Sequence, residues 1–280
     1  VSAQEGSSAD VLAVDSASSP VLGDGVSYDK AIYVNTTGDD SNSGSQTSPY
    51  ATINKGISSV NASDNAVIYL SEGTFTGDNN TDLSINLAHK NYNGSLTFVG
   101  RGYDKTFIDG EQMAPIFKSM SEDSIIVFKN IAFINGKSNT GGAITSNAVL
   151  TIDNCLFEDN YATGYNGGAI YQQSNDFKVT NSIFRNNSVN SYGGSIFASS
   201  MQNAQLMNCV FENSIARSTY CSGAGAYIDA YNSTIIKNNR FVNISTSGNA
   251  KDAALYANSG YNGNGIILLS TVTIKGKVVL

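Results

Sequence analysis

The amino-acid sequence predicts an all-β fold, a right-handed parallel β-helix with an N-terminal capping helix. Three observations predict it: an Asn-x-x-Phe segment recurs along the chain, a glycine-rich segment recurs between its copies, and short alternating strands lie between the two. The composition agrees, because 27 of the 280 residues are Gly, 41% are hydrophobic and only 14% are charged. Many short strands joined by tight polar turns are typical of a solenoid.

The first repeated segment places an Asn three residues before a Phe. Its five copies are Asn130 to Phe133, Asn154 to Phe157, Asn181 to Phe184, Asn208 to Phe211 and Asn238 to Phe241. Successive Phe residues are 24, 27, 27 and 30 residues apart. Coils stacked about 4.8 Å apart bury an apolar face that one coil cannot bury alone. We therefore expect the five Phe in the core and the five Asn in a hydrogen-bonded structural ladder along the axis.

The second repeated segment is Gly-Gly followed by a small residue and Ile. It occurs at Gly141–Ile144, Gly167–Ile170 and Gly193–Ile196, with weaker forms at Gly223–Ala226 and Asp252–Leu255. A glycine pair suits a corner that needs positive φ or a close approach between backbones. Alternating segments such as Val149–Ile152 and Phe177–Thr180 are predicted strands of these coils.

The first part of the chain is less regular. We expect residues 1–27 to be a flexible N-terminal segment and residues 28–280 to form the β-helix domain. A helix is predicted from Pro49 to Val60, with Pro49 at its first position, and it would cover the open end of the stack. The predicted early strands are Ala31–Val34, Ala66–Leu70, Ser95–Val99, Thr106–Ile108 and Ser124–Phe128.

Charge and cysteine content exclude several function classes. The chain has 23 acidic and 16 basic residues without a basic cluster, so we expect no nucleic-acid partner. No apolar run approaches 18 residues, so no membrane span is predicted. Three cysteines and one histidine, without a Cys-x-x-Cys pair, make a disulfide framework or a zinc site improbable. The opening Val1-Ser2-Ala3 fits a small-residue signal-peptide cleavage site, and an extracellular or cell-surface location is expected.

Two sets of residues resemble known families. Tyr33-Val34, Gly38-Asp39-Asp40 and Pro49–Ile53 resemble the entry motif of secreted right-handed β-helix proteins, some of which are polysaccharide lyases. The alternation of Gly-Gly-Ala-Ile with Phe-x-x-Asn, as in Phe157–Asn160 and Phe184–Asn187, is similar to the repeat of chlamydial polymorphic outer-membrane proteins. It also resembles the adhesin-like surface proteins of methanogenic archaea, to which the combination is most similar. This resemblance implies a cell-surface β-helix and is weak for function, because the motifs are framework residues.

The tyrosines supply the candidate ligand-binding residues. The chain has 15 Tyr and no Trp, and Tyr165, Tyr192 and Tyr220 each fall shortly before the glycine segment of successive coils. If their rings point outward, they stack along the rod and suit sugar rings or a protein partner. Packing within the coils is the alternative role for the same three rings.

Catalytic and metal-binding residues are harder to find. Asp39 and Asp40 are weak candidates for Ca²⁺, but Asp and Asn in such a loop more often bond to local backbone, so no cofactor is expected. Glu158, Arg185 and Glu212 occupy one repeat position in three coils. An ion ladder on the surface is favoured there over a catalytic trio.

The sequence therefore favours an extracellular, adhesin-like binding module without catalytic activity. Its expected partners are glycans or surface proteins of another cell. The main alternative is a polysaccharide lyase or glycoside hydrolase of the β-helix type, which would need a pair of carboxylates or a Ca²⁺ site on one face. A third hypothesis is that the β-helix is a structural spacer between other domains.

Overall fold

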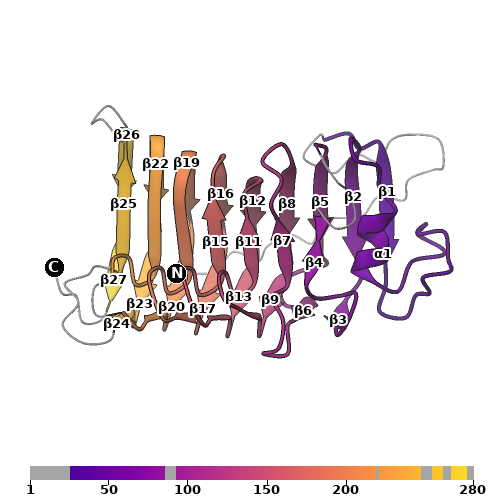
Figure 1. Cartoon of the computed structure of the whole chain (residues 1–280), viewed down its shortest axis with the longest axis horizontal. Coiled ribbons are helices and arrows are strands. Elements are labelled where there is room, and N and C mark those ends of the chain that lie inside the picture. Colours follow the sequence, from indigo (N-terminus) through magenta and orange to yellow (C-terminus); the bar gives the residue numbers. More distant parts are fainter. Residues whose placement is uncertain (1–25, 86–92, 219–220, 247–253, 261–265, 276–280) are drawn as a thin grey trace, which may run out of the picture.

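The computed structural model describes residues 26–85, 93–218, 221–246, 254–260 and 266–275. The strands form three parallel sheets along one long axis, and the chain passes from sheet to sheet in each coil (Figure 1). The protein is a right-handed parallel β-helix, and the predicted fold class is confirmed. Most of the segment expected to be flexible, residues 1–27, lies outside the described residues.

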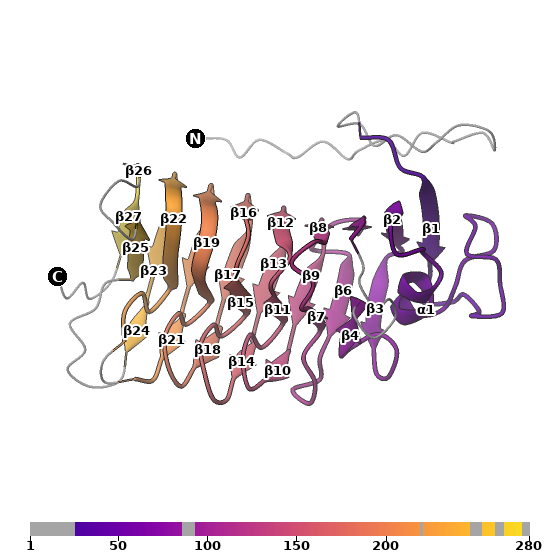
Figure 2. The same ribbon diagram turned by 45° about the horizontal axis from the view of Figure 1, so that its top comes forward.

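The three sheets differ in size. The 14-stranded sheet contains β1 (Lys30–Val34), β2 (Asn65–Leu70), β4 (Leu83–Ser84), β5 (Ser95–Val99), β7 (Phe117–Ser119), β8 (Ile125–Lys129), β11 (Ile144–Ser146), β12 (Val149–Asp153), β15 (Ile170–Gln173), β16 (Phe177–Thr180), β19 (Ile196–Met207), β22 (Ala226–Lys237), β25 (Leu255–Ser259) and β26 (Ile266–Ser270). The eight-stranded sheet contains β3 (Gly73–Thr76), β6 (Thr106–Asp109), β9 (Ala132–Ile134), β13 (Leu156–Glu158), β17 (Ile183–Arg185), β20 (Val210–Glu212), β23 (Arg240–Val242) and β27 (Thr273–Lys275). The five-stranded sheet contains β10 (Lys137–Ser138), β14 (Tyr161–Ala162), β18 (Ser188–Val189), β21 (Ile215–Ala216) and β24 (Ser245–Thr246), which lie side by side along one edge in Figure 2.

The repeated Phe residues form one column in the core. Each of the five is fully buried, and successive rings from Phe133 to Phe241 stack with centroids 4.8, 4.9, 4.7 and 4.6 Å apart. Strand register explains this, because Phe157 pairs with both Phe133 and Phe184 in parallel strands. The predicted core position of these residues is confirmed.

The repeated Asn residues turn the chain between the 14-stranded and eight-stranded sheets. All five have a left-handed backbone, with φ between 52° and 60°. Asn154 donates from Nδ2 to Asn130 Oδ1 at 2.7 Å, and Asn208 donates to Asn181 Oδ1 at 3.0 Å. The expected row is therefore present, although its side chains bond to one another rather than only to backbone. It is interrupted once, because Asn181 donates to Asp153 Oδ1 instead of Asn154.

The glycine pair has two separate requirements. Gly167 needs its positive φ of 75°, which L residues rarely adopt. Gly168 needs close approach, because a Cβ there would lie 1.9 Å from the carbonyl oxygen of Gly194 in the next coil. Both reasons expected from the sequence therefore apply, each to a different member of the pair.

The predicted helix is present but shorter than expected. Helix α1 covers Ile53–Ser58, and the hydroxyl of Thr52 caps it by accepting from the backbone N–H of Lys55. The prediction that Pro49 begins the helix was wrong, because Pro49 and Tyr50 instead hydrogen-bond to the loop after β1. The apolar side of α1 is buried in the core at the β1 end of the solenoid (Figure 1).

Candidate functional site

Tyr165 and Tyr192, two of the three tyrosines singled out from the sequence, differ in their burial. Tyr165 is 64% exposed, whereas Tyr192 is half-buried and packs against a small cluster that includes Ala162 and Val189. Tyr220 lies outside the described residues. Tyr165 stands two positions and Tyr192 one position before the first glycine of its motif, so the two residues occupy different repeat positions. Rings at different offsets do not fall into register between parallel coils. Ligand binding by Tyr165, Tyr192 and Tyr220 stays a prediction.

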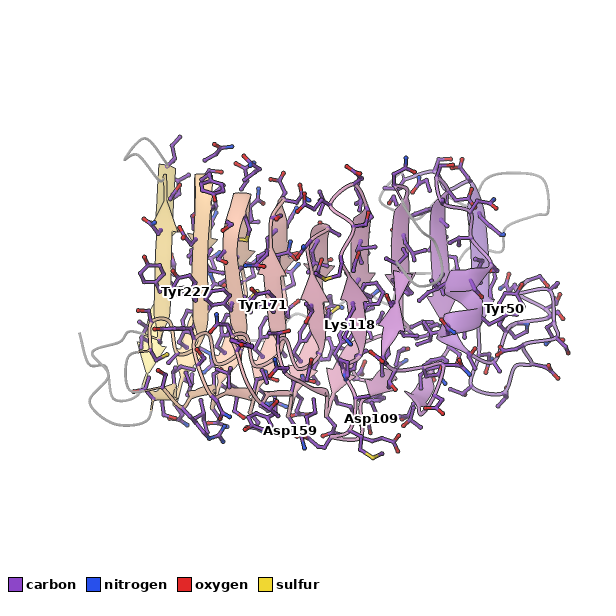
Figure 3. The ribbon with its side chains drawn as sticks, in the orientation of Figure 1. Tyr50, Asp109, Lys118, Asp159, Tyr171 and Tyr227 are labelled. Carbon is purple, nitrogen blue, oxygen red and sulfur yellow. The ribbon has the colours of Figure 1, made fainter. Side chains whose placement is uncertain are left out.

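Another aromatic row does stack on the outside of the 14-stranded sheet. Tyr171 of β15, Phe197 of β19, Tyr227 of β22 and Tyr256 of β25 pair in register across neighbouring strands. Their ring centroids are 5.6, 4.7 and 4.4 Å apart, and the interplanar angles are 7°, 17° and 10°. We call these four residues the aromatic ladder. Tyr171 and Tyr227 are labelled on this sheet in Figure 3.

The sequence contains a signal for the aromatic ladder that was missed. Tyr171, Phe197 and Tyr227 each stand four residues after the first glycine of a motif, and Tyr256 stands four residues after Asp252 of the weakest copy. A constant offset is what register between parallel coils requires. Residues stack between coils when their distance from the glycine motif is the same in every coil, and a position merely close to the motif does not ensure this.

The rings of the aromatic ladder are half-buried, and they shield one another. Because they stack nearly parallel, each inner ring covers the faces of its neighbours and directs an edge outward. Burial raises the pKa of Tyr227 to about 12, and the neighbouring Tyr256 and Asp229 also disfavour its ionisation. Burial also raises the pKa of Tyr171. Both hydroxyls therefore remain neutral hydrogen-bonding groups at physiological pH.

A row of polar side chains runs beside the aromatic ladder. Residues two positions further along a strand point to the same face, which places Gln173, Ser199, Asp229 and Asn258 next to the four rings. Asn258 donates from Nδ2 to Asp229 Oδ1 at 3.0 Å. We call these four residues the polar row. An apolar strip bordered by hydrogen-bonding groups suits a ligand with both kinds of surface.

Tyr192 extends the aromatic surface on the other side. Its ring lies 6.4 Å from that of Tyr227 at an angle of 56°. It comes from the loop before the glycine motif, where its backbone N–H donates to Asn166 Oδ1 at 3.1 Å. One of the three predicted tyrosines therefore joins the aromatic surface, although its role in ligand binding stays a prediction.

The aromatic ladder ends abruptly toward the N-terminus. The register continues from Tyr171 to Thr145 of β11 and then to Lys118 of β7. Thr145 is nearly buried, and its hydroxyl donates to the carbonyl oxygen of Thr140 at 2.8 Å. Lys118 forms an exposed ion pair with Asp82, with Nζ and Oδ1 2.9 Å apart. Lys118 and Tyr171 are labelled in Figure 3.

Asp39 and Asp40 both accept hydrogen bonds from backbone N–H groups. Asp39 Oδ1 accepts from the N–H and hydroxyl of Ser41 at 2.8 and 2.7 Å, and these bonds lower the pKa of its carboxyl group. Asp40 accepts from the N–H groups of Ala51 and Thr52, both at 2.9 Å. The described residues contain no group of three or more His, Cys, Asp or Glu side chains placed to hold a metal ion. The turn-forming interpretation thus fits Asp39, whereas Asp40 bonds to backbone 11 and 12 residues further along the chain. The expected lack of a cofactor stays a prediction.

The carboxylates considered for catalysis form an ion network on the eight-stranded sheet. Arg185 lies between Glu158 and Glu212, with N–O distances of 3.1 and 3.2 Å, and Arg240 adds a bond of 2.9 Å to Glu212. Hydrogen bonds to the two glutamates raise the pKa of Arg185, which remains charged. The predicted ion ladder is present, and Arg240 extends it by one coil. Carboxylates already paired in this way are poor general acids or bases.

The chain is similar in structure to known proteins at low sequence identity. No protein-family model matches the chain, and no curated protein sequence matches it. A structure titled rhamnogalacturonan lyase is similar at 12% identity and a TM-score of 0.39, over 77% of this chain and 74% of that one. A pectin methylesterase from Aspergillus niger is similar at 14% identity and a TM-score of 0.34, over 89% and 91%. At this level neither carries an activity or a substrate over to this chain. Among the described residues, no helix combines the length and apolar character needed to cross a membrane.

Proposed function

We propose that the protein is an extracellular, adhesin-like binding module that recognises glycans or surface proteins of another cell and has no catalytic activity. The observation that carries this proposal is the aromatic ladder with its polar row, set on a rigid sheet. Aromatic anchors beside hydrogen-bonding side chains are enriched where proteins bind partners. The resemblance to methanogen adhesin-like proteins supports the cell-surface location.

The ion network supports a non-catalytic role. Glu158 and Glu212, the carboxylates that share a repeat position, are both held by Arg185. A hydrolase of this fold would need two carboxyl groups free to act on one bond. Because Glu158 and Glu212 are both paired with Arg185, they fit a surface ion ladder better than a catalytic acid and base.

Binding to a glycan array and to candidate partner cells tests the proposal. The purified chain should bind at least one of them, and combined Phe197→Ser and Tyr227→Ser substitutions should weaken that binding about tenfold or more. Tyr33→Ser is a matched control, because Tyr33 also stacks on an outward tyrosine, Tyr69, at 5.0 Å but lies near the other end of the solenoid. Circular dichroism should show that each variant remains folded.

Two results would contradict the proposal. Failure of the folded chain to bind any glycan or cell, at both low and high salt, removes the binding function. Release of oligosaccharides from a panel of neutral and uronate-containing polysaccharides would instead favour the lyase or hydrolase alternative.

A further inference from the structure

We propose that the aromatic ladder binds a ligand with a positively charged group, and that the carboxylate of Asp229 pairs with that group. The group is an ammonium or a guanidinium, which a partner protein carries on Lys or Arg and a glycan carries on an amino sugar. This inference rests on the proposed binding function and specifies the class of its ligand.

The register places Asp229 beside the rings. Asp229 follows Tyr227 by two residues in β22, so both side chains point to the outer face of the sheet. Tyr227 pairs with Tyr256 in the next coil, and Asp229 pairs with Asn258. Burial, Tyr256 and Asp229, in that order, raise the pKa of Tyr227, which agrees with a carboxylate close to that ring.

The carboxylate of Asp229 has no cationic partner among the described residues. Its bond from Asn258 Nδ2, at 3.0 Å, comes from a neutral amide. By contrast, Glu158 and Glu212 are paired with Arg185. Asp229 is also half-buried, so its charge is screened less than that of a fully exposed acid. A cationic ligand would therefore supply the partner that Asp229 lacks within the described fold.

The groups around Asp229 suit the uncharged part of such a ligand. The rings of Tyr227 and Tyr256 stack with centroids 4.4 Å apart. Their outward edges offer an apolar surface to the methylene chain of Lys or Arg, or to the C–H groups of a sugar. Ser199 and Asn258 of the polar row add hydroxyl and amide groups that can bond to O–H or N–H groups of the ligand.

Charge favours a cationic ligand over an anionic one. Asp229 is the one charged side chain in the aromatic ladder and the polar row, and the whole chain has a formal charge of −7. A uronate or an acidic peptide would be repelled at this surface, whereas an ammonium or guanidinium would be attracted.

Two matched pairs of probes test the charge of the ligand. Oligomers of glucosamine and of N-acetylglucosamine share a backbone and differ in the charge of the amine at mildly acidic pH. Peptides with Lys or with norleucine at one position differ in the same way. Titration calorimetry of the folded chain should show that the charged member of at least one pair binds about tenfold or more tighter than the neutral member. The pair that shows this preference identifies a glycan or a protein as the source of the cation.

Substitution of Asp229 tests its role directly. Asp229→Asn keeps the shape of the side chain and an oxygen that accepts from Asn258, but removes the charge. It should lower the affinity for the charged probe to that for the neutral probe, which should itself change by less than about threefold. Asp176→Asn is the matched control, because Asp176 also accepts from an Asn of the next coil, Asn203, at 3.0 Å but stands just before β16, outside the aromatic ladder. Melting temperatures should show that both variants remain folded.

Each outcome separates this inference from the proposed function. Loss of the preference in Asp229→Asn but not in Asp176→Asn supports the inference. A neutral probe that binds as tightly as its charged counterpart in both pairs overturns it, as does a preference that survives Asp229→Asn. Loss of the preference in both variants also overturns it, because the net charge of the chain would then be the cause. Binding to cells without binding to either charged probe overturns the inference and leaves the binding function in place. Absence of all binding overturns both.

Discussion

At the residue scale, the corners of the coils depend on a property that asparagine shares with few other residues. Its side chain tolerates a left-handed backbone, which most L residues reach at a cost of about 1–2 kcal/mol. Asn208 combines this backbone with hydrogen bonds to neighbouring coils. Its φ is 57°, its side chain donates to Asn181 at 3.0 Å, and it accepts from Asn238 at 3.1 Å. The repeated Asn therefore fixes a turn and links three coils at once.

Substitution of Asn208 should separate the contribution of its left-handed backbone from that of its side-chain hydrogen bonds. Asn208→Gly keeps the left-handed turn and loses two exposed hydrogen bonds, so we expect a loss of about 1 kcal/mol in unfolding free energy. Asn208→Ala also forces a methyl group into that backbone and should cost about 1–2 kcal/mol more. Urea denaturation measures both losses.

A matched position provides the control for these two variants. Asn232 is exposed and lacks a positive φ, so Asn232→Ala should be no worse than Asn232→Gly. If Asn208→Ala is as stable as Asn208→Gly, the backbone argument for this corner is wrong.

At the element scale, parallel register turns a repeated residue into a continuous stack. Phe184 lies between Phe157 and Phe211, with ring centroids 4.9 and 4.7 Å away and both angles 5°. Phe241 has a Phe ring of this column on one described side only, at 4.6 Å. Both side chains are fully buried, so their environments differ mainly in the number of stacked neighbours.

Removing a ring from the middle of the column should therefore cost more than removing one near its end. We expect Phe184→Ala to lower the unfolding free energy by about 3–5 kcal/mol, and Phe241→Ala by less. Phe184→Leu should cost clearly less than Phe184→Ala, because it leaves a smaller cavity. Thermal and urea denaturation test the order, and an equal cost for the two alanine variants would show that stacking adds nothing to burial.

Parallel register also explains which features could be predicted from the sequence, because it aligns residues that recur at the same position in each coil. The Phe column and the Asn corners were predictable because each residue recurs with a fixed partner three positions away. The aromatic ladder was missed because Tyr and Phe share its positions, so the pattern is visible only as a constant offset from the glycine motif. The helix boundary was also missed, because Pro49 and Tyr50 accept hydrogen bonds from the loop after β1, and the helix begins only after the cap at Thr52.

The ion pair between Lys118 and Asp82 could not be predicted in the same way. The two residues are 36 positions apart in a part of the chain without a clear repeat. Residues with irregular spacing are placed by the fold rather than by a pattern. They are also the residues in which one coil differs from the next, and specific recognition needs such differences.

At the scale of the whole molecule, buried titratable groups predict how stability changes with pH. Burial raises the pKa of Cys155 and of Cys209 to about 12, and burial is also the main cause of the raised pKa of Tyr227. In the unfolded chain these groups titrate near 8.5 for Cys and 10 for Tyr. Between the two sets of values the folded protein holds more protons than the unfolded one, so rising pH destabilises the fold.

We therefore expect the urea midpoint to stay level from pH 7 to about 8 and then to fall continuously until about pH 12. Tyr227→Phe keeps the stacked ring and removes the titrating hydroxyl, so it should flatten the part of the decline above about pH 10. Replacement of Cys155 and Cys209 by Ala should flatten the part that begins nearer pH 8.5. Each variant is compared with its own stability at pH 7, where all three groups are protonated in both states. Persistence of the full decline in the combined variant would mean that other groups, rather than these buried ones, set the alkaline limit of the solenoid.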